Sequence, residues 1–179
     1  MALWLTEQQA EMLIHLAGQA APSEACGLIA GRDGRAMEII LIPNMAPNPQ
    51  HNFEMESRAF VEAMFAIEKR ELSLIAVYHS HPVGEAIPSP TDIREFKYPD
   101  VDYLIVGLKN NRPRFAAWTI QQGEVSPVKL HIGPTKPVSE PVGSLTNGQH
   151  IAVVLSLILA VAFLISVSLV LLPPAPNIP

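Results

Sequence analysis

Short apolar runs bounded by turn residues alternate, along residues 1–132, with segments in which apolar residues recur every three or four positions. Runs of the first kind are typical of strands, and the second spacing is typical of helices. The predicted helices cover residues 7–18, 58–70 and 90–96. The predicted strands cover 36–42, 74–78, 102–108, 114–120 and 125–132, together with the apolar run after Glu24 and an N-terminal strand or lead-in at 1–5. Few helices among many strands predict an α/β domain with a mixed β-sheet flanked by helices.

Polar residues mark the ends of several of these elements. Thr6 and Gln9 are spaced as a capping box, and Ser57 is the expected N-cap of the second helix. The sequence Arg-Asp-Gly-Arg at 32–35 predicts a tight hairpin turn before the strand at 36–42.

Two histidines directly follow the predicted strand at 74–78. Side chains alternate between the two faces of a strand, so His79 and His81 are expected to project from the same side. Pro82 and Gly84 then end the strand and turn the chain. Two imidazoles on one face are half of a site for a first-row transition metal.

The chain then begins a helix with residues that suit an N-terminus. Ser89 is expected at the N-cap, Pro90 at the first helical position, and Asp92 within the first turn. From there the Asp92 carboxylate can reach back to the strand end as a third ligand. Two histidines and one carboxylate leave a fourth tetrahedral position for water, as in catalytic zinc sites. The alternative is that the histidines merely end a strand, while Ser89 and Asp92 only cap the helix.

A zinc hydrolase also needs a proton acceptor, and Glu24 is the candidate. It lies where a helix gives way to an apolar strand, so its carboxylate could face the metal from the edge of the sheet. The alternative is a solvated loop glutamate, because Glu24 is far from His79 along the chain. Cys26, in the apolar run nearby, is expected to be a buried packing thiol rather than a nucleophile.

Taken together, Glu24, the pair His79-x-His81 followed by proline, and Ser89-x-x-Asp92 resemble the signature of the JAMM, or MPN-plus, metalloprotease family. The short prokaryotic form, with its Glu-x-Cys-Gly-Leu strand, is the most similar. The resemblance implies an α/β fold of JAMM/MPN type with a cytidine-deaminase-like architecture. It also implies that His79, His81 and Asp92 bind Zn2+. In this family pattern Glu24 takes a proton from water, and Ser89 stabilises the oxyanion.

The resemblance covers residues 3–132 and implies cleavage of peptide or isopeptide bonds at the C-terminal tail of a ubiquitin-like or sulfur-carrier protein. Family members that recognise ubiquitin chains typically carry an insertion after the aspartate ligand. The segment after Asp92 is short here, which disfavours a ubiquitin chain as the substrate. The alternative function is a non-catalytic MPN-type scaffold that recruits partners to a membrane. Such relatives typically lack some of the metal ligands, whereas this chain has all of them.

Composition narrows the function further. The 179 residues carry 12 Lys and Arg against 17 Asp and Glu, a net charge of −5, so the chain is not expected to bind nucleic acid. This disfavours a DNA-processing protein of the RadC type, which carries a similar His-x-His-Pro and Ser-x-x-Asp run. A single cysteine cannot form an internal disulfide, and it excludes the cysteine-containing zinc site of base deaminases.

The last quarter of the chain differs in composition from the rest. Residues 133–150 contain several prolines and glycines and predict a flexible linker. Residues 151–172 carry no charge and are long enough to span a membrane as a helix, and 173–179 form a short tail. The expected organisation is therefore a metalloprotease domain at 1–132, a linker and a C-terminal membrane anchor.

Two features of this anchor predict its orientation and its pairing. Lys129 and Lys136 precede the span and no positive charge follows it, so the catalytic domain is expected on the cytoplasmic side. The single cysteine fits this reducing compartment. Ala152, Ser156 and Ala160 recur every four residues, a stripe of small residues that could pair two such helices in a homodimer.

Overall fold

The computed structural model describes residues 2–98 and 100–134. In this part of the chain, seven strands form one sheet that closes on itself in the order β1, β3, β2, β4, β5, β6, β7. The strands are β1 (Ala2–Leu5), β2 (Cys26–Arg32), β3 (Arg35–Ile42), β4 (Ser73–His81), β5 (Asp102–Gly107), β6 (Arg114–Gln121) and β7 (Glu124–Ile132). The helices are α1 (Glu7–Ala20), α2 (Ser57–Lys69) and α3 (Pro90–Glu95), with a short 3-10 turn at Lys109–Asn111.

The pairing of these strands confirms the predicted mixed sheet. Strand β1 runs parallel to β3 and β7, β4 runs parallel to β5, and the other neighbours are antiparallel. The sequence does not predict that the sheet closes. Closure arises because β1 pairs with β7 along its whole length and meets β3 at a single pair, Trp4 and Arg35.

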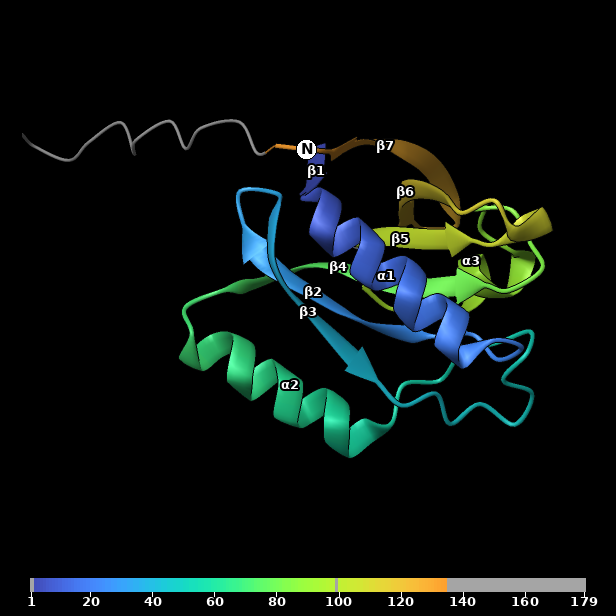
Figure 1. Ribbon diagram of the computed structural model, residues 1–179. Helices are drawn as coiled ribbons and strands as arrows, with labels where there is room; N and C mark the ends of the chain where they lie inside the picture. Colours follow the sequence, from blue (N-terminus) through green and yellow to red (C-terminus); the bar gives the residue numbers. More distant parts are fainter. Residues whose placement is uncertain (1, 99, 135–179) are drawn as a thin grey trace, which may run out of the picture. The chain divides into compact units, whose positions relative to one another are not determined.

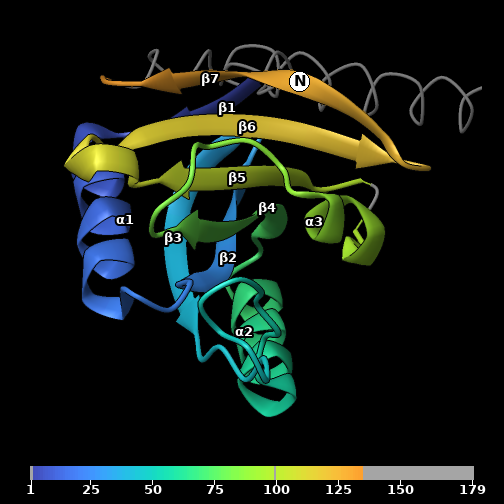
Figure 2. The ribbon, with the colours of Figure 1, turned by 90° about the vertical axis from the view of Figure 1, so that its right-hand side faces the viewer.

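Alternating side chains of the central strand β4 divide the interior into two cores. Ala76 and Tyr78 pack in the same core as Leu13 of α1, whereas Val77 packs in the other core with Ile67 of α2. Figures 1 and 2 show α1 and α2 well separated, each lying against the strands. Residues two apart in a strand share a face. His79 and His81, two and four residues after Val77, therefore lie on the same side as Val77, the α2 side.

Side-chain caps begin the helices, and one of them differs from the prediction. The capping box of α1 at Thr6 is present as predicted. The predicted N-cap of α2 is wrong: the cap is Glu56, whose carboxylate accepts the N–H groups of Arg58 and Ala59, and Ser57 is the first helical residue. The usual caps are Ser, Thr, Asp and Asn, so the pattern favoured the serine over the longer glutamate.

The C-terminal predictions fall beyond this part of the chain. Residues 135–150 of the predicted linker, the predicted span at 151–172 and the tail at 173–179 lie outside the described residues. Among the residues that the structure does describe, no helix is both long and apolar enough to cross a membrane. The membrane anchor therefore stays a prediction from the sequence.

Candidate metal centre

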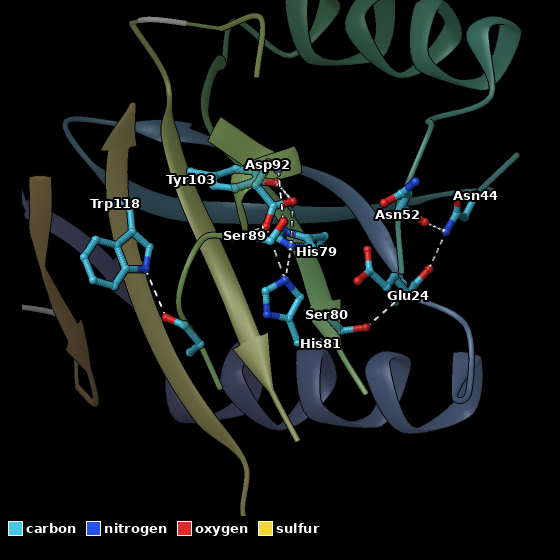
Figure 3. A network of polar contacts seen from close by, with 12 residues as sticks. Glu24, Asn44, Asn52, His79, Ser80, His81, Ser89, Asp92, Tyr103 and Trp118 are labelled. Carbon is cyan, nitrogen blue, oxygen red and sulfur yellow. Dashed lines mark hydrogen bonds and ion pairs between the residues drawn. The ribbon is translucent and has the colours of Figure 1, made fainter. Parts of the chain in front are cut away.

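Two histidines at the end of β4 face each other across a short gap. The Nε2 atoms of His79 and His81 are 2.8 Å apart, and the side chains are 0% and 13% exposed. Strand β5 pairs with β4 at both histidines, and β2 pairs with β4 at His79, so neighbouring strands hold the backbone of this pair. Figure 3 shows the two imidazoles next to each other, in agreement with the prediction that they project from the same side of the strand.

The start of α3 brings a carboxylate to this pair. Asp92 Oδ1 lies 3.4 Å from His79 Nε2, and Asp92 Oδ2 lies 3.4 Å from His81 Nε2. Ser89 is the N-cap, in a reciprocal capping box: its N–H donates to Asp92 Oδ2 (2.7 Å), and the Asp92 N–H donates to Ser89 Oγ (3.1 Å). The structure thus brings all four residues together, and Asp92 does more than cap its own helix.

Glu24 reaches the same place from the segment before β2. One of its carboxylate oxygens and one ring nitrogen from each of His79 and His81 all lie within 4.8 Å of one another. Glu24 is only 5% exposed, so the alternative of a solvated loop glutamate is wrong. The pairing of Cys26 with His79 between β2 and β4 accounts for this approach. The Oε2 atom of Glu24 is buried and has no hydrogen-bond partner among the described residues.

Hydrogen bonds hold the Glu24 segment against β4. The Ala25 N–H donates to Ser80 Oγ (2.8 Å), and the Ser80 N–H donates to the Ala25 carbonyl (2.9 Å). The Asn44 side chain donates to the Glu24 carbonyl (3.0 Å), and the Glu24 N–H donates to the Pro49 carbonyl (2.7 Å). Ser80 lies between the two histidines in the sequence. The strand that carries the histidines therefore also anchors the segment that carries Glu24 (Figure 3).

These side chains fit a zinc ion. Two imidazole nitrogens and one carboxylate are one of the ligand sets of catalytic zinc sites, which keep a fourth position for water. The buried, unpartnered Oε2 of Glu24 requires a polar partner, and a water beside the ligands would supply one. His79, His81 and Asp92 would hold the ion, and Zn2+ is the cofactor that this arrangement fits.

Burial shifts the pKa values of these groups. It raises the pKa of Glu24 to about 7, an effect that His81 opposes and Asp92 reinforces. It lowers the pKa of His79, which favours the neutral imidazole that binds a metal. For Asp92, burial acts to raise the pKa, but hydrogen bonds with His79 and His81 outweigh it and hold the pKa well below its usual range. Glu24 can therefore exchange a proton near neutral pH while Asp92 stays ionised.

Two aromatic residues complete the site, and the sequence does not single them out. Tyr103 of β5 donates its hydroxyl to Asp92 Oδ1 (3.0 Å), and its ring stacks on His79 with 4.8 Å between centroids. Phe53 also stacks on His79, again at 4.8 Å. Strand alternation could assign Tyr103 to one face of its strand. Only the pairing of Tyr103 with Val77 between β5 and β4 places it beside the histidines.

The loop between β4 and α3 orients the second histidine. The Glu85 carbonyl lies 2.8 Å from His81 Nδ1 and accepts its N–H, which leaves Nε2 to face Asp92. Trp118 of β6 donates its indole N–H to the Ala86 carbonyl in the same loop (3.1 Å; Figure 3). Gly107 of β5 lets this loop approach, because a Cβ there would lie 2.7 Å from the Glu85 carbonyl carbon.

An open cleft of about 530 Å³ adjoins the metal centre. Asp92 and Tyr103 line both, so a molecule in the cleft would lie next to the metal ligands. Much of the remaining lining is apolar or aromatic and comes from the segment before α2, from α2 itself and from the residues that follow α3. Lining residues of this kind include Phe53, Met55, Phe60, Phe96 and Tyr98. The volume is within the range of sites that bind ligands.

Comparison with known proteins places this fold and site in a family. A sequence profile described as prokaryotic homologs of the JAB domain matches residues 6–121. A probable TtuB-protein conjugate cleaving protease from Thermus thermophilus is 44% identical over 93 residues, which are 51% of this chain and 61% of that protein. A desampylase from Pyrococcus furiosus is 30% identical over 108 residues, which are 60% of this chain and 74% of that protein. The solution structure of a protein from Desulfitobacterium hafniense has a TM-score of 0.67 at 28% identity, and the match covers 75% of this chain and 95% of that one.

The extent of these matches differs. The alignment with the Thermus protein spans less than two thirds of that relative's length. The family profile runs from the start of α1 to the end of β6. It therefore contains every residue of the metal centre, from Glu24 to Tyr103. On this match, the chain belongs to the prokaryotic homologs of the JAB domain.

Proposed function

We propose that this chain is a zinc-dependent peptidase or isopeptidase of the JAMM type, and that it cleaves the bond at the C-terminal tail of a ubiquitin-like or sulfur-carrier protein. The observation that carries the proposal is the buried Glu24 carboxylate, which faces ring nitrogens of His79 and His81. The Thermus relative is named for cleaving a protein conjugate, which supports this class of substrate. The cleft beside Asp92 offers room for a polypeptide.

The residues of the site have different roles in the proposed hydrolysis. His79, His81 and Asp92 would hold the ion, which when bound acidifies water and acts as a Lewis acid toward a carbonyl. Glu24 takes a proton from the attacking water as the water oxygen bonds to the scissile carbonyl carbon. When the carbon–nitrogen bond breaks, Glu24 gives this proton to the leaving amine. A pKa of about 7 suits Glu24 to both transfers.

Ser89 has two compatible roles in this scheme. Its Oγ accepts the N–H of Asp92 in the capping box, while its own O–H stays available to donate to the oxyanion. The same helix start therefore carries a metal ligand and the oxyanion donor. A shift of α3 would displace both at once.

Glu24→Gln tests the proposal directly. The amide has nearly the shape of the carboxylate but cannot accept the proton, so hydrolysis should fall by about 100- to 10,000-fold. Zinc content should stay at about one ion per chain, because Glu24 is not assigned as a ligand. The assay uses a ubiquitin-like protein that ends in diglycine and is joined through an isopeptide bond to a fluorescent lysine.

Glu62→Gln, on the exposed face of α2, is the matched control and should keep full activity. Comparable turnover by Glu24→Gln would refute the assigned base, and loss of zinc from that variant would make Glu24 a ligand instead. The alternative function, a non-catalytic scaffold, predicts that the wild-type chain shows no turnover even when zinc is bound.

The Glu24→Gln form, kept in membranes, can also trap natural substrates for identification.

We also propose that residues 151–172 anchor the catalytic domain to the cytoplasmic face of a membrane. The support is in the sequence: 22 uncharged residues follow a linker with several prolines and glycines, and the nearest lysines lie before the segment. Tethering would raise the effective concentration of substrates at the same membrane. A homodimer through the stripe of small residues stays a prediction.

A further inference from the structure

Tyr103 occupies a place at the metal centre where the proposed reaction gives it no step. Its hydroxyl donates to Asp92 Oδ1 at 3.0 Å, and the residue is 1% exposed. Its ring stacks on His79, with centroids 4.8 Å apart and planes inclined by 22°. One side chain from β5 therefore contacts two of the proposed metal ligands, one from β4 and one from α3 (Figure 3).

The two oxygens of Asp92 are held by donors from different parts of the fold. Oδ2 accepts the N–H of Ser89, three residues away in the same capping box (2.7 Å). That bond fixes the carboxylate relative to α3, a helix of six residues, but not relative to the sheet. Among the described residues, the Tyr103 hydroxyl is the group besides the two histidines that ties this carboxylate to the sheet. Because each oxygen has its own donor, rotation of the carboxylate would break at least one of these bonds.

We propose that Tyr103 is a positioning residue that holds Asp92 and His79 in the ligand arrangement before the metal binds, an inference that rests on the metal site of the proposed function. A carboxylate held by hydrogen bonds and an imidazole held by a stacked ring lose less conformational freedom when the ion binds. Tyr103 therefore raises the affinity for zinc without itself contacting the ion.

Tyr103→Phe removes only the hydroxyl and leaves the ring to stack on His79. We expect the dissociation constant of the full chain for zinc to rise by about 10- to 100-fold, the usual effect of losing a hydrogen-bond partner of a metal ligand. Competition with a chromogenic chelator measures this constant. Wild type and variant are compared at the same pH, after circular dichroism has shown that both are folded.

Tyr78→Phe is the matched control. Tyr78 is a tyrosine of β4, 1% exposed, whose hydroxyl has no partner among the described residues. It packs in the core that contains Leu13 of α1, on the face of β4 opposite to the histidines. Removal of the buried Tyr78 hydroxyl should leave the zinc affinity of the chain at the wild-type value.

Asp92→Asn separates positioning from a general structural effect. Because the hydroxyl is proposed to act through the Asp92 carboxylate, Tyr103→Phe should weaken zinc binding much less in the Asp92→Asn chain than in wild type. Unchanged zinc affinity in Tyr103→Phe, or an equal loss in both backgrounds, would overturn the proposal. So would an equal loss in Tyr78→Phe, because any lost buried hydroxyl would then have the same effect.

The zinc measurement needs no substrate, so its failure is distinguishable from failure of the proposed function. A chain that shows the expected loss in Tyr103→Phe but hydrolyses nothing would support the positioning and refute the hydrolase. A chain that hydrolyses its substrate while Tyr103→Phe binds zinc as tightly as wild type would support the hydrolase and refute the positioning role of Tyr103. A wild-type chain that binds no zinc would overturn both.

Discussion

Individual residues of the metal centre depend on neighbours from other strands. His81 presents Nε2 to Asp92 because its Nδ1 atom is paired with the Glu85 carbonyl, 2.8 Å away. That carbonyl belongs to a loop that approaches β5 at Gly107, where there is no side chain to keep it away. Gly107, which has no metal-binding group, thus influences the orientation of the proposed ligand His81.

Gly107→Ala should disturb this ligand without touching it. The added Cβ would lie 2.6 Å from the Ala86 nitrogen and 2.7 Å from the Glu85 carbonyl carbon, so the loop must move and the hydrogen bond to His81 must weaken. We expect the free energy of unfolding to fall by about 1–3 kcal/mol from overpacking. Zinc binding should weaken by about 10-fold or more. Urea unfolding and chelator competition measure the two effects.

Gly18→Ala in α1 is the control, because a Cβ at Gly18 meets no atom within 4 Å. It should leave zinc affinity unchanged and raise the free energy of unfolding by about 0.5–1 kcal/mol, the helix preference of alanine over glycine. Wild-type zinc affinity in Gly107→Ala would mean that the orientation of His81 does not depend on the close approach of this loop.

Among the elements, α2 begins at Ser57, one residue before its predicted start, and has an unexpected cap. The Glu56 carboxylate accepts the N–H of Arg58 (3.0 Å) and the N–H of Ala59 (2.5 Å), two groups that have no partner within the helix. The bonds from Ala59 and Arg58 lower the pKa of Glu56. Because α2 lines the cleft beside the metal centre, its cap matters to the site as well as to the fold.

Glu56→Ala should destabilise the folded chain, whereas Ser57→Ala, at the residue that the pattern favoured, should change its stability little. The effect of Glu56 should depend on pH. Because its pKa is lowered in the folded state, its contribution is complete above the ordinary carboxyl pKa and is lost as the pH falls through the lowered value. Urea unfolding of both variants and of wild type at neutral and acid pH measures this. Equal stability of Glu56→Ala and wild type at neutral pH would contradict the assigned cap.

At the scale of the whole molecule, the chain combines a folded domain with a segment of different composition. The described residues build a closed sheet with a core on each face, and the metal centre lies on the α2 side. Residues 151–172 show no periodic pattern of polar positions and carry no charge. A uniform apolar segment of this length suits lipid on all sides rather than one face of a core.

The full chain should therefore stay with membranes during a wash with alkaline carbonate, and a chain that ends at residue 150 should be released. The truncated chain should keep its zinc and its kcat/KM for a soluble conjugate, because the residues of the metal centre lie between Glu24 and Tyr103. It should lose activity toward conjugates at the membrane. Complete release of the full chain by carbonate would contradict the anchor.

Local patterns were enough to predict much of the fold and part of the site. Alternation along β4 determines that His79 and His81 share a face, because successive side chains of a strand point to opposite sides. The residue types and order of Ser89, Pro90 and Asp92 determine a helix start with Ser89 as its N-cap, because each of these residues suits its position at a helix N-terminus. Each of these is a property of a few consecutive residues, so the sequence by itself determined it.

The tertiary structure decided how these segments meet. Glu24 lies beside the histidines because β2 pairs with β4, and Tyr103 lies there because β5 pairs with β4 in one particular register. Closure of the sheet likewise depends on β1 meeting β7, from the two ends of the domain. Strand periodicity determines which face a residue occupies, but not which strands become neighbours or in what register. Those choices depend on how buried surfaces fit together across the whole fold.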